Sequence, residues 1–407
     1  MKLREAGVDT NGARSGSRRP RVLMISNHSY PKDSVTRRNA ECLALHGSQV
    51  DLICSGDRSD AGLSRPPEGL RVIRLPFSHR RSSALRYLIE YAAFSGTASL
   101  VATYLVLRRA YATVQVDNPP DLLAIAALPA RWRGARIVLN MVELVPEMTA
   151  TRLRVSRRHP IVRLSRVLES MAMGMAQHVI TVSNTCLRVL EGRGLDPRRV
   201  TIVPNSVDVS VTGERQEPDP PRLVTLASLI ERYGVQVAIR AMPLLRDRWP
   251  GLTLHVLGEG EYKGELIRLS HELGVADRVV FQGFVPWDEA MRQVRSATIG
   301  LVPVIADGYG ELIMPTKLME MVALGVPVVC ARLPAIEEYF PADALAYFRA
   351  ADPESMAARI NELLRDPEMR REQSDRARIA AKGQSWAAVT DRYVSAVLPG
   401  AAVGETP

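Results

Sequence analysis

The sequence predicts an α/β protein made of two lobes, each built around a doubly wound parallel sheet. Short apolar strands alternate with helical segments in two series, one before residue 208 and one after it. Such alternation is typical of parallel sheets with helices on both faces. Between the two series, residues 208–221 are rich in Asp, Glu, Pro and Gly, which indicates a linker.

The elements follow in a regular order along the chain. The first series has predicted strands at 21–26, 49–54, 69–75, 114–116, 136–139 and 178–182, with a helix that ends near Ala44. The second series has strands at 223–227, 253–257, 279–282, 299–302, 326–330 and 346–348, and helices at 235–245, 261–273, 287–295, 315–324 and 353–365.

These elements divide the chain into four parts. Residues 1–19 are polar and rich in Gly, Ser and Arg, and we expect a disordered basic tail without a signal peptide. The first domain covers 20–207 and the second covers 208–385. The final segment, 386–407, contains Trp386 and is expected to be helical.

The charge is distributed unevenly. Residues 1–200 hold 31 Lys and Arg and 16 Asp and Glu, a balance of +15; the rest holds 53 − 31 = 22 and 44 − 16 = 28, a balance of −6. No zinc-finger, helix-turn-helix or RNA-binding aromatic motif is present, so nucleic acid is not the expected partner. An anionic membrane surface suits the basic half better. The alternative is that the charge is ordinary solvated surface.

Tyr91–Leu107 is an uncharged run of 17 residues. It reaches only the low end of a membrane span and contains several small and hydroxyl residues, so a span is not expected. A buried core helix and an interfacial helix flanked by arginines both remain open.

The four cysteines lack C-x-x-C spacing, and no H-E-x-x-H or D-x-D motif occurs. We therefore expect reduced core cysteines, no bound metal and no cofactor.

The most informative segment is Met314–Cys330. Pro315 suits the first position of a helix, and Gly325 followed by Pro327 suits its end. The polar side of this helix carries Thr316 and Glu320, with Lys317 beside them. A hydroxyl, an ammonium group and a carboxylate near a positive helix end suit a ligand with phosphates and a diol, such as a nucleotide-sugar.

The run P-T-K-L-M-E-x-x-A-L-G-V-P-V-V resembles the nucleotide-sugar signature of the family-4 retaining glycosyltransferases. The resemblance implies the GT-B fold, in which two Rossmann-like domains enclose an interdomain cleft. It also implies that Thr316 and Lys317 hold the diphosphate, and that Glu320 binds the ribose. In the family, a C-terminal helix crosses back to the first domain, which we expect of residues 386–407.

Three further motifs of the second half resemble family segments. In D-G-Y-G-E, which ends at Glu311, Gly310 brings the backbone close to the donor, and Glu311 is predicted to replace the family glutamate absent at Leu312. Leu312 itself is also expected to lie in the nucleotide-sugar site. Arg232 is the only cation in a loop that usually binds the diphosphate. The backbone near Gly283 and Phe284 resembles the segment that lies along the nucleobase.

The first half carries Glu143 at the end of a strand, where the family often has a histidine followed by an acid. We expect Glu143 to contact the acceptor or the donor sugar; a helix-start carboxylate is the alternative. Together with Arg232, Glu311 and Lys317, it completes the set of residues expected to act in catalysis.

The resemblance implies a metal-independent, retaining transferase of surface glycan biosynthesis. The donor is a UDP- or GDP-sugar and the acceptor a lipid-linked glycan or a polysaccharide. We expect a cytoplasmic protein peripheral to the inner face of the cell membrane, with Arg152, Arg154, Arg157 and Arg158 binding lipid. Two alternatives remain: another GT-B enzyme, such as a nucleotide-sugar epimerase or a glycogen-synthase-like transferase, and a non-catalytic relative that only binds nucleotide-sugar.

Overall fold

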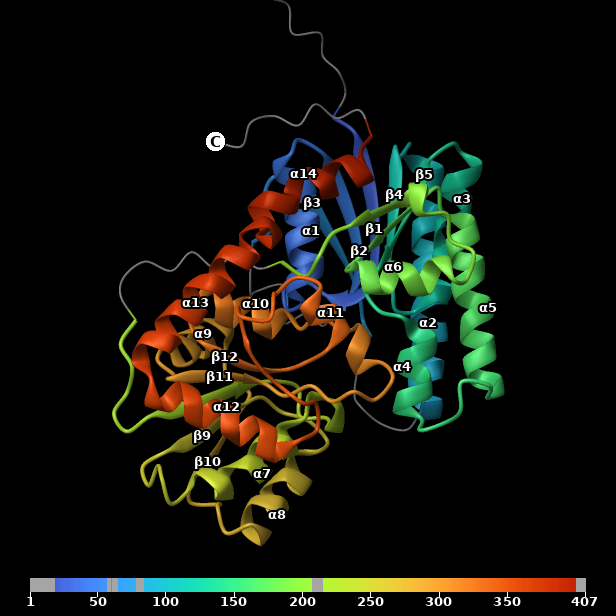
Figure 1. Ribbon diagram of the computed structural model, residues 1–407. Helices are drawn as coiled ribbons and strands as arrows, with labels where there is room; N and C mark the ends of the chain where they lie inside the picture. Colours follow the sequence, from blue (N-terminus) through green and yellow to red (C-terminus); the bar gives the residue numbers. More distant parts are fainter. Residues whose placement is uncertain (1–18, 57–59, 61–64, 78–83, 207–214, 400–407) are drawn as a thin grey trace, which may run out of the picture.

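The structure, a computed structural model, describes residues 19–56, 60, 65–77, 84–206 and 215–399. Two lobes are visible, each with a parallel sheet covered by helices (Figure 1). The predicted tail lies outside the described residues except for Arg19. The predicted domain boundary at 207/208 also lies outside them and stays a prediction.

The sheet of the first lobe has the order β3-β2-β1-β4-β5-β6-β7, with every pairing parallel. Its strands are β1 (Arg21–Ser29), β2 (Gln49–Ser55), β3 (Leu70–Leu75), β4 (Thr113–Asp117), β5 (Arg136–Met141), β6 (His178–Thr181) and β7 (Val200–Ile202). The sequence predicts six of them. It misses β7, whose three residues are too few to establish a strand pattern.

Alternation along the strands separates two apolar cores in this lobe. Leu23 and Ile25 point to a core shared with α2 (Ala84–Arg108), η2 (Asp121–Ala127) and α5 (Pro160–Met175). Val22 and Met24 point to the opposite core, shared with α1 (Ser34–Leu45) and α14 (Trp386–Val397). Successive side chains on a strand face opposite ways, so one strand contributes to both cores. The remaining helices of this lobe are α3 (Leu128–Trp132), α4 (Val145–Arg152), α6 (Asn184–Glu191) and the short η3 (Pro197–Arg199).

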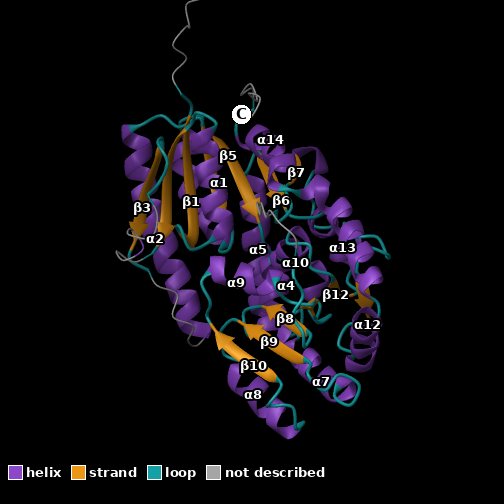
Figure 2. Ribbon diagram, turned by 90° about the vertical axis from the view of Figure 1, so that its left-hand side faces the viewer, coloured by secondary structure: helices purple, strands orange, loops and turns teal. Residues whose placement is uncertain are grey.

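The sheet of the second lobe has the order β10-β9-β8-β11-β12-β13 and is also parallel (Figure 2). Its strands are β8 (Arg222–Leu226), β9 (Thr253–Leu257), β10 (Val279–Gly283), β11 (Ile299–Val302), β12 (Val328–Ala331) and β13 (Ala346–Phe348). Its helices are η4 (Glu231–Tyr233), α7 (Val235–Leu245), α8 (Lys263–Glu272), α9 (Trp287–Arg295), η5 (Gly310–Leu312), α10 (Thr316–Ala323), α11 (Pro334–Glu337), α12 (Pro353–Arg365), α13 (Pro367–Ala381) and η6 (Lys382–Gln384). The sequence does not predict α13, because its exposed surface is mostly charged and its apolar stripe is narrow.

The last helix, α14, packs on the sheet of the first lobe (Figure 1). The fully buried Tyr393 donates its hydroxyl hydrogen bond to Gln115 Oε1 at 2.9 Å, and Thr113 Oγ1 donates to the carbonyl of Val397 at 2.8 Å. The chain therefore crosses between the lobes twice, once before β8 and once before α14.

The helix α2 contains the uncharged run of 17 residues. Phe94, Ala98 and Ala102 are buried on its inner side, whereas Leu100 and Tyr104 are exposed on its outer side. Thus one helix serves as a core helix and also presents an apolar surface. Within the part of the chain that the structure describes, no helix has both the length and the apolar character needed to cross a membrane.

Candidate functional site

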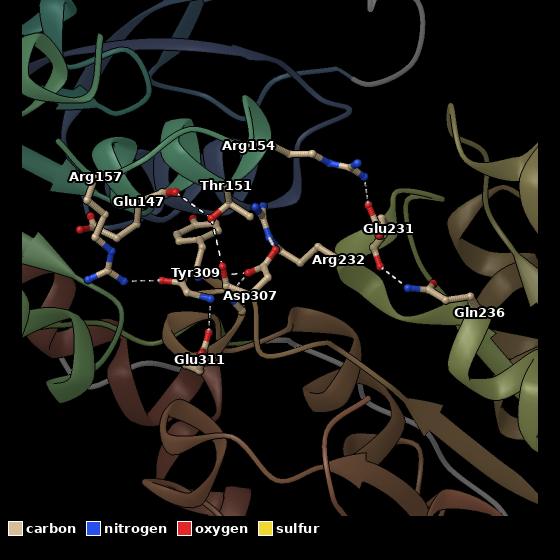
Figure 3. A network of polar contacts seen from close by, with 12 residues as sticks. Glu147, Thr151, Arg154, Arg157, Glu231, Arg232, Gln236, Asp307, Tyr309 and Glu311 are labelled. Atoms are coloured by element: carbon tan, nitrogen blue, oxygen red, sulfur yellow. Dashed lines mark hydrogen bonds and ion pairs between the residues drawn. The ribbon is translucent and has the colours of Figure 1, made fainter. Parts of the chain in front are cut away.

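The lobes meet around the loop between β11 and α10. Tyr309 from this loop is only 6% exposed and packs into the apolar core of the first lobe. Thr151 Oγ1 on α4 donates to the carbonyl of Asp307 at 3.4 Å, and Arg157 donates to the carbonyl of Gly308 at 3.4 Å (Figure 3). Burial raises the pKa of Tyr309 well above its usual value, so its hydroxyl stays protonated. The loop is thus anchored in both lobes.

The same loop closes on itself through two carboxylates. Asp307 Oδ1 accepts hydrogen bonds from the N–H groups of Tyr309 and Gly310 at 3.1 and 2.8 Å, and Glu311 Oε2 accepts one from Gly308 at 2.8 Å. A Cβ on Gly310 would lie 1.9 Å from the carbonyl oxygen of Ile305, so only glycine fits there. Glu311 therefore occupies a fixed position at the lobe junction, half-buried beside the loop.

Arg232 lies against this loop from η4. Its Nε donates to Asp307 Oδ2 at 2.8 Å, and its guanidinium stacks 4.7 Å from the centre of the Tyr309 ring. The sequence places this cation at a diphosphate site. In the structure part of its charge is balanced by Asp307, so a phosphate would have to share Arg232 with that carboxylate.

The helix α10 presents Lys317 and Glu320 on one side. Glu320 is only 3% exposed; its Oε1 accepts a hydrogen bond from Trp287 Nε1 at 3.3 Å, and its Oε2 lies 3.4 Å from Lys317 Nζ. That second oxygen is buried without a hydrogen bond. A buried carboxylate oxygen in this state can accept a hydrogen bond from a ligand hydroxyl.

The start of α10 lies at the hinge between the lobes. Asn205, just before the linker, donates to the carbonyl of Met314 at 3.3 Å. Pro315 precedes the helix as its N-cap residue, one position earlier than predicted, and no side chain caps the N–H groups that follow. Gly325 ends the helix region with a φ of +71°, as the sequence predicts.

Two exposed aromatic side chains follow the end of β10, and the second of them, Trp287, donates to Glu320. Phe284 is 81% exposed and Trp287 is 49% exposed, three residues later on α9. Gly283 has a φ of +76°, a left-handed conformation that favours glycine, and a Cβ there would lie 2.7 Å from the end of the flexible Glu259 side chain. The sequence identifies Gly283 and Phe284 but not Trp287; its place three residues after an exposed Phe is the signal that could have found it.

Glu143 follows β5 in the first lobe and faces the second. Burial raises the pKa of its carboxyl, while the nearby charges of His28 and Arg232 act in the opposite direction. The fully buried Asn118 fixes the strand end: its Oδ1 accepts from the N–H groups of Val142 and Glu143 at 2.8 and 3.2 Å, and its Nδ2 donates to the Glu143 carbonyl at 2.7 Å. Glu143 and Arg232 come from opposite lobes and lie near enough for the charge of Arg232 to oppose the rise in the pKa of the Glu143 carboxyl.

Leu312 takes a different place from the other predicted residues. Its side chain packs against the apolar core of the first lobe, and its carbonyl accepts a contact from Cys186 Sγ at 3.5 Å. This placement gives Leu312 a packing function at the junction and offers no support for donor contact.

A second junction forms at Glu338, which follows α11. Its carboxylate accepts four hydrogen bonds of 2.7 to 3.0 Å from the backbone and side chains of Asn184 and Thr185 at the start of α6. Burial acts to raise the pKa of Glu338, but these hydrogen bonds outweigh it and the pKa is lowered. The sequence gives no signal for this contact, because the partners are more than 150 residues apart.

The arginines expected to bind lipid lie partly at the lobe junction. Arg154 forms an ion pair with Glu231, and Arg157 contacts Gly308. Beside them is an open cavity of about 320 Å³ lined by Glu147, Ala150, Thr151, Arg154, Val155, Arg157, Asp307 and Gly308. Arg154 and Arg157 thus make contacts between the lobes, and their expected role in lipid binding stays a prediction.

Two family models together match most of the chain. The description "Glycosyl transferase 4-like domain" applies to residues 33–206, and "Glycosyl transferases group 1" applies to residues 212–380. The first match covers strands and helices of the first lobe. The second covers the second lobe, including Arg232, Glu311 and α10.

Individual proteins resemble the chain in sequence or in fold. A GDP-mannose-dependent alpha-(1-6)-phosphatidylinositol monomannoside mannosyltransferase from Mycolicibacterium smegmatis is 32% identical over 172 residues, 42% of this chain and 44% of that protein. The chain thus spans under half the length of that relative. Sucrose-phosphate synthase from Thermosynechococcus elongatus superposes with a TM-score of 0.71 at 17% identity, over 92% of this chain and 97% of that one. HepE from Anabaena, in complex with UDP, gives 0.66 at 15% identity, over 91% and 98%. These structural matches confirm the GT-B fold.

Proposed function

Because this chain belongs to the family-4 glycosyltransferases of the GT-B fold, with a 4-like domain followed by a group 1 domain, we propose that it transfers a sugar from a nucleoside diphosphate sugar to a hydroxyl group. The acceptor we propose is a lipid-linked glycan or a polysaccharide under synthesis.

One observation supports the donor site above all others. Glu320 holds a buried oxygen without a hydrogen bond, next to Lys317 and the uncapped start of α10. Burying a carboxylate costs free energy unless partners compensate it, and the ion pair with Lys317 at 3.4 Å does so only in part. A ribose diol would supply the missing hydrogen bond, and the diphosphate would lie toward Lys317 and the helix N–H groups, whose partial positive charge attracts anions.

The reaction would depend on stabilising the departing diphosphate. As the bond to the sugar breaks, negative charge grows on the phosphate oxygens, and Lys317, Arg232 and the start of α10 are the positive groups available in the described site. Fixed donors aimed at developing charge lower the barrier without reorganising. We propose that they do so without a metal ion.

Proton transfer makes smaller demands on the protein. We propose that an oxygen of the departing phosphate takes the acceptor proton and that the sugar keeps its anomeric configuration. Glu143, with its raised pKa, would contact the acceptor or the donor sugar from the first lobe. Glu311, fixed by Gly308, would reach the sugar from the second.

The proposed acceptor and the proposed location are both inferred from one relative of the chain. The mannosyltransferase from Mycolicibacterium smegmatis is named for an acceptor built on phosphatidylinositol. A lipid-borne acceptor requires the enzyme to work at a bilayer, and we propose that this chain acts on the inner face of the cell membrane as a peripheral protein.

Release of nucleoside diphosphate tests the activity directly. The full chain would be screened by thermal shift against UDP-, GDP- and dTDP-sugars, and the best donor would then be incubated to measure free diphosphate. Wild-type protein should release it slowly even without acceptor. Glu320→Gln should weaken donor binding by roughly tenfold or more, because a hydrogen bond to a charged group is worth about 1.5–3 kcal/mol. Glu354→Gln, an exposed acid on α12, should bind as wild type.

A non-catalytic nucleotide-sugar-binding protein is the second candidate. The pairing of Arg232 with Asp307 favours it, since a neutralised arginine stabilises a leaving group less. Donor binding with no release of UDP or GDP, even with a lipid extract as acceptor, would support this candidate and reject the transferase.

A further inference from the structure

One side of the first lobe exposes many large apolar side chains. The described residues include sixteen large hydrophobic side chains that are exposed, and nine of them lie on α2, η2, α3 and α5. We call these nine the apolar face: Ile89, Leu100, Tyr104, Leu107, Ile125, Trp132, Leu164, Val167 and Met171.

The apolar face is a continuous feature of the fold. Both α2 and α5 pack against η2, and α3 continues η2, so these helices form one layer over the sheet (Figure 1). Leu100, Tyr104 and Leu107 follow helical spacing on α2, as do Leu164, Val167 and Met171 on α5. These positions lie opposite the inner sides that form the core. Scattered exposed apolar residues need no explanation, but a gathered set indicates a binding surface.

The charges around the apolar face have one sign. Between residues 89 and 175 the exposed ionisable side chains other than Tyr104 and His159 are all arginines. They include Arg108 on α2, Arg131 and Arg133 beside Trp132, and Arg163 on α5. The six acids in the same segment are all buried or half-buried: Glu90, Asp117, Asp121, Glu143, Glu147 and Glu169.

Apolar side chains surrounded by arginines indicate what binds to the apolar face. A second copy packed face to face would bring arginines against arginines, since a twofold interface pairs each patch with itself. Nucleic acid would meet the arginines, but the mostly aliphatic side chains offer its bases little stacking. A bilayer with anionic headgroups satisfies both: the apolar side chains enter the acyl boundary and the arginines meet the headgroups. Trp132, 82% exposed between two arginines, is the kind of side chain that anchors proteins at this depth.

We propose that the apolar face docks the first lobe onto an anionic membrane through α2, α3 and α5. The proposal rests on the proposed function in one respect only. If the chain is a transferase, the purpose of docking is to hold the cleft beside a lipid-borne acceptor.

Vesicle flotation of the full chain tests the docking. The probes are phosphatidylcholine vesicles with and without phosphatidylglycerol. Wild-type protein should float with the anionic vesicles, and less so at high salt. The combined variant Leu100→Gln, Trp132→Ala and Leu164→Gln should lose at least about tenfold in binding, because it removes apolar surface that would leave water. The combined variant Arg131→Gln and Arg133→Gln should lose about fivefold per arginine.

Matched controls come from elsewhere on the surface. Leu45→Gln and Ile379→Gln remove side chains that are 75% and 73% exposed on α1 and α13. Arg248→Gln and Arg371→Gln remove exposed arginines of the second lobe. Both control pairs should float as wild type, and thermal melts should show that every variant is folded.

Three results would overturn the proposal. The first is flotation of the apolar-face variants equal to wild type. The second is a wild-type dimer that the apolar-face variants convert to monomer, which would identify a second copy as the occupant. The third is retention of single-stranded RNA that these variants abolish while vesicle binding persists.

Release of nucleoside diphosphate distinguishes the docking proposal from the proposed function. Variants that no longer float yet still release nucleoside diphosphate support the docking, and a chain that floats without releasing it contradicts only the transferase.

Discussion

The two lobes share an architecture, but their acidic side chains differ in environment and therefore in pKa. In the first lobe, burial raises the pKa of Asp117, Asp121, Glu143 and Glu169. In the second lobe, hydrogen bonds to partners lower the pKa of Glu265, Glu289 and Glu338.

This difference adds to an imbalance already present in the composition, which is +15 for the first half against −6 for the rest. Where the first lobe buries its acids, as it does between residues 89 and 175, arginines dominate the surface. The parallel sheet and its helices do not determine this. The same fold therefore supports a basic surface on one lobe and, as we propose, an anion-binding helix on the other.

The largest expected effect concerns the buried acids of the first lobe. Burial raises the pKa of Asp121 to about 7, although a hydrogen bond from Asn118 opposes the change. An unfolded Asp has a pKa of about 3.9, so stability is fully present below pH 4 and is lost as pH rises toward 7, by roughly 4 kcal/mol.

Asp121→Asn should remove this loss. Chemical denaturation should show the variant more stable than wild type at pH 8 and similar at pH 4, with unchanged donor affinity. Equal pH profiles for both proteins would show that Asp121 is ionised in the fold.

The next largest effect is expected when the proposed anion site of the second lobe loses its lysine. Lys317→Met should reduce the rate of donor turnover by about 100- to 1000-fold, the range found when a fixed donor to a developing anion is removed. Lys317→Arg should keep much of it, because the charge is retained. Lys382→Met, an exposed lysine beyond α13, is the matched control. Wild-type turnover in Lys317→Met would place the diphosphate elsewhere.

A smaller effect is expected when Glu311, the carboxylate at the lobe junction, loses its charge. Glu311→Gln can still accept the hydrogen bond from Gly308 through its amide oxygen, so the loop should hold its shape. Loss of the charge should reduce turnover by about tenfold, equivalent to about 1.4 kcal/mol. Steady-state assays with the donor identified above provide the measurement, and unchanged turnover would reject a role for Glu311 at the donor sugar.

The smallest effect concerns the contact between the lobes. Glu338→Gln should lower the free energy that holds α11 against α6 by about 1 kcal/mol, because the amide nitrogen that replaces one carboxylate oxygen is a donor and cannot accept the hydrogen bonds from the N–H groups at the start of α6. The lowered pKa means that the wild-type contact is present above about pH 4.3 and weakens only as pH falls through the folded value. Small-angle scattering should detect lobe opening in the variant at neutral pH, and in wild type only in acid. A variant as compact as wild type would show that Tyr309 and the 307–311 loop hold the lobes alone.

Patterns within a few residues were enough to predict most of the fold. The continuous apolar run of β1, the apolar stripe of α10 and the stop at Gly325 are local features, and the structure contains all three. The sequence misses β7, which is too short, and α13, which has little apolar surface. The pairing of Lys317 with Glu320 also follows from spacing along a single helix.

What the sequence alone determined is the pair of parallel sheets and the side of α10 that carries Lys317 and Glu320, because hydrophobic period and helix-end residues act over one or two turns. Only the tertiary structure decided that Arg232 pairs with Asp307, that Trp287 meets Glu320 and that Glu338 joins the start of α6. These partners are separated by 75, 33 and more than 150 residues. Packing of strands and closure of the lobes bring them together, and no local pattern along the chain encodes such a pairing.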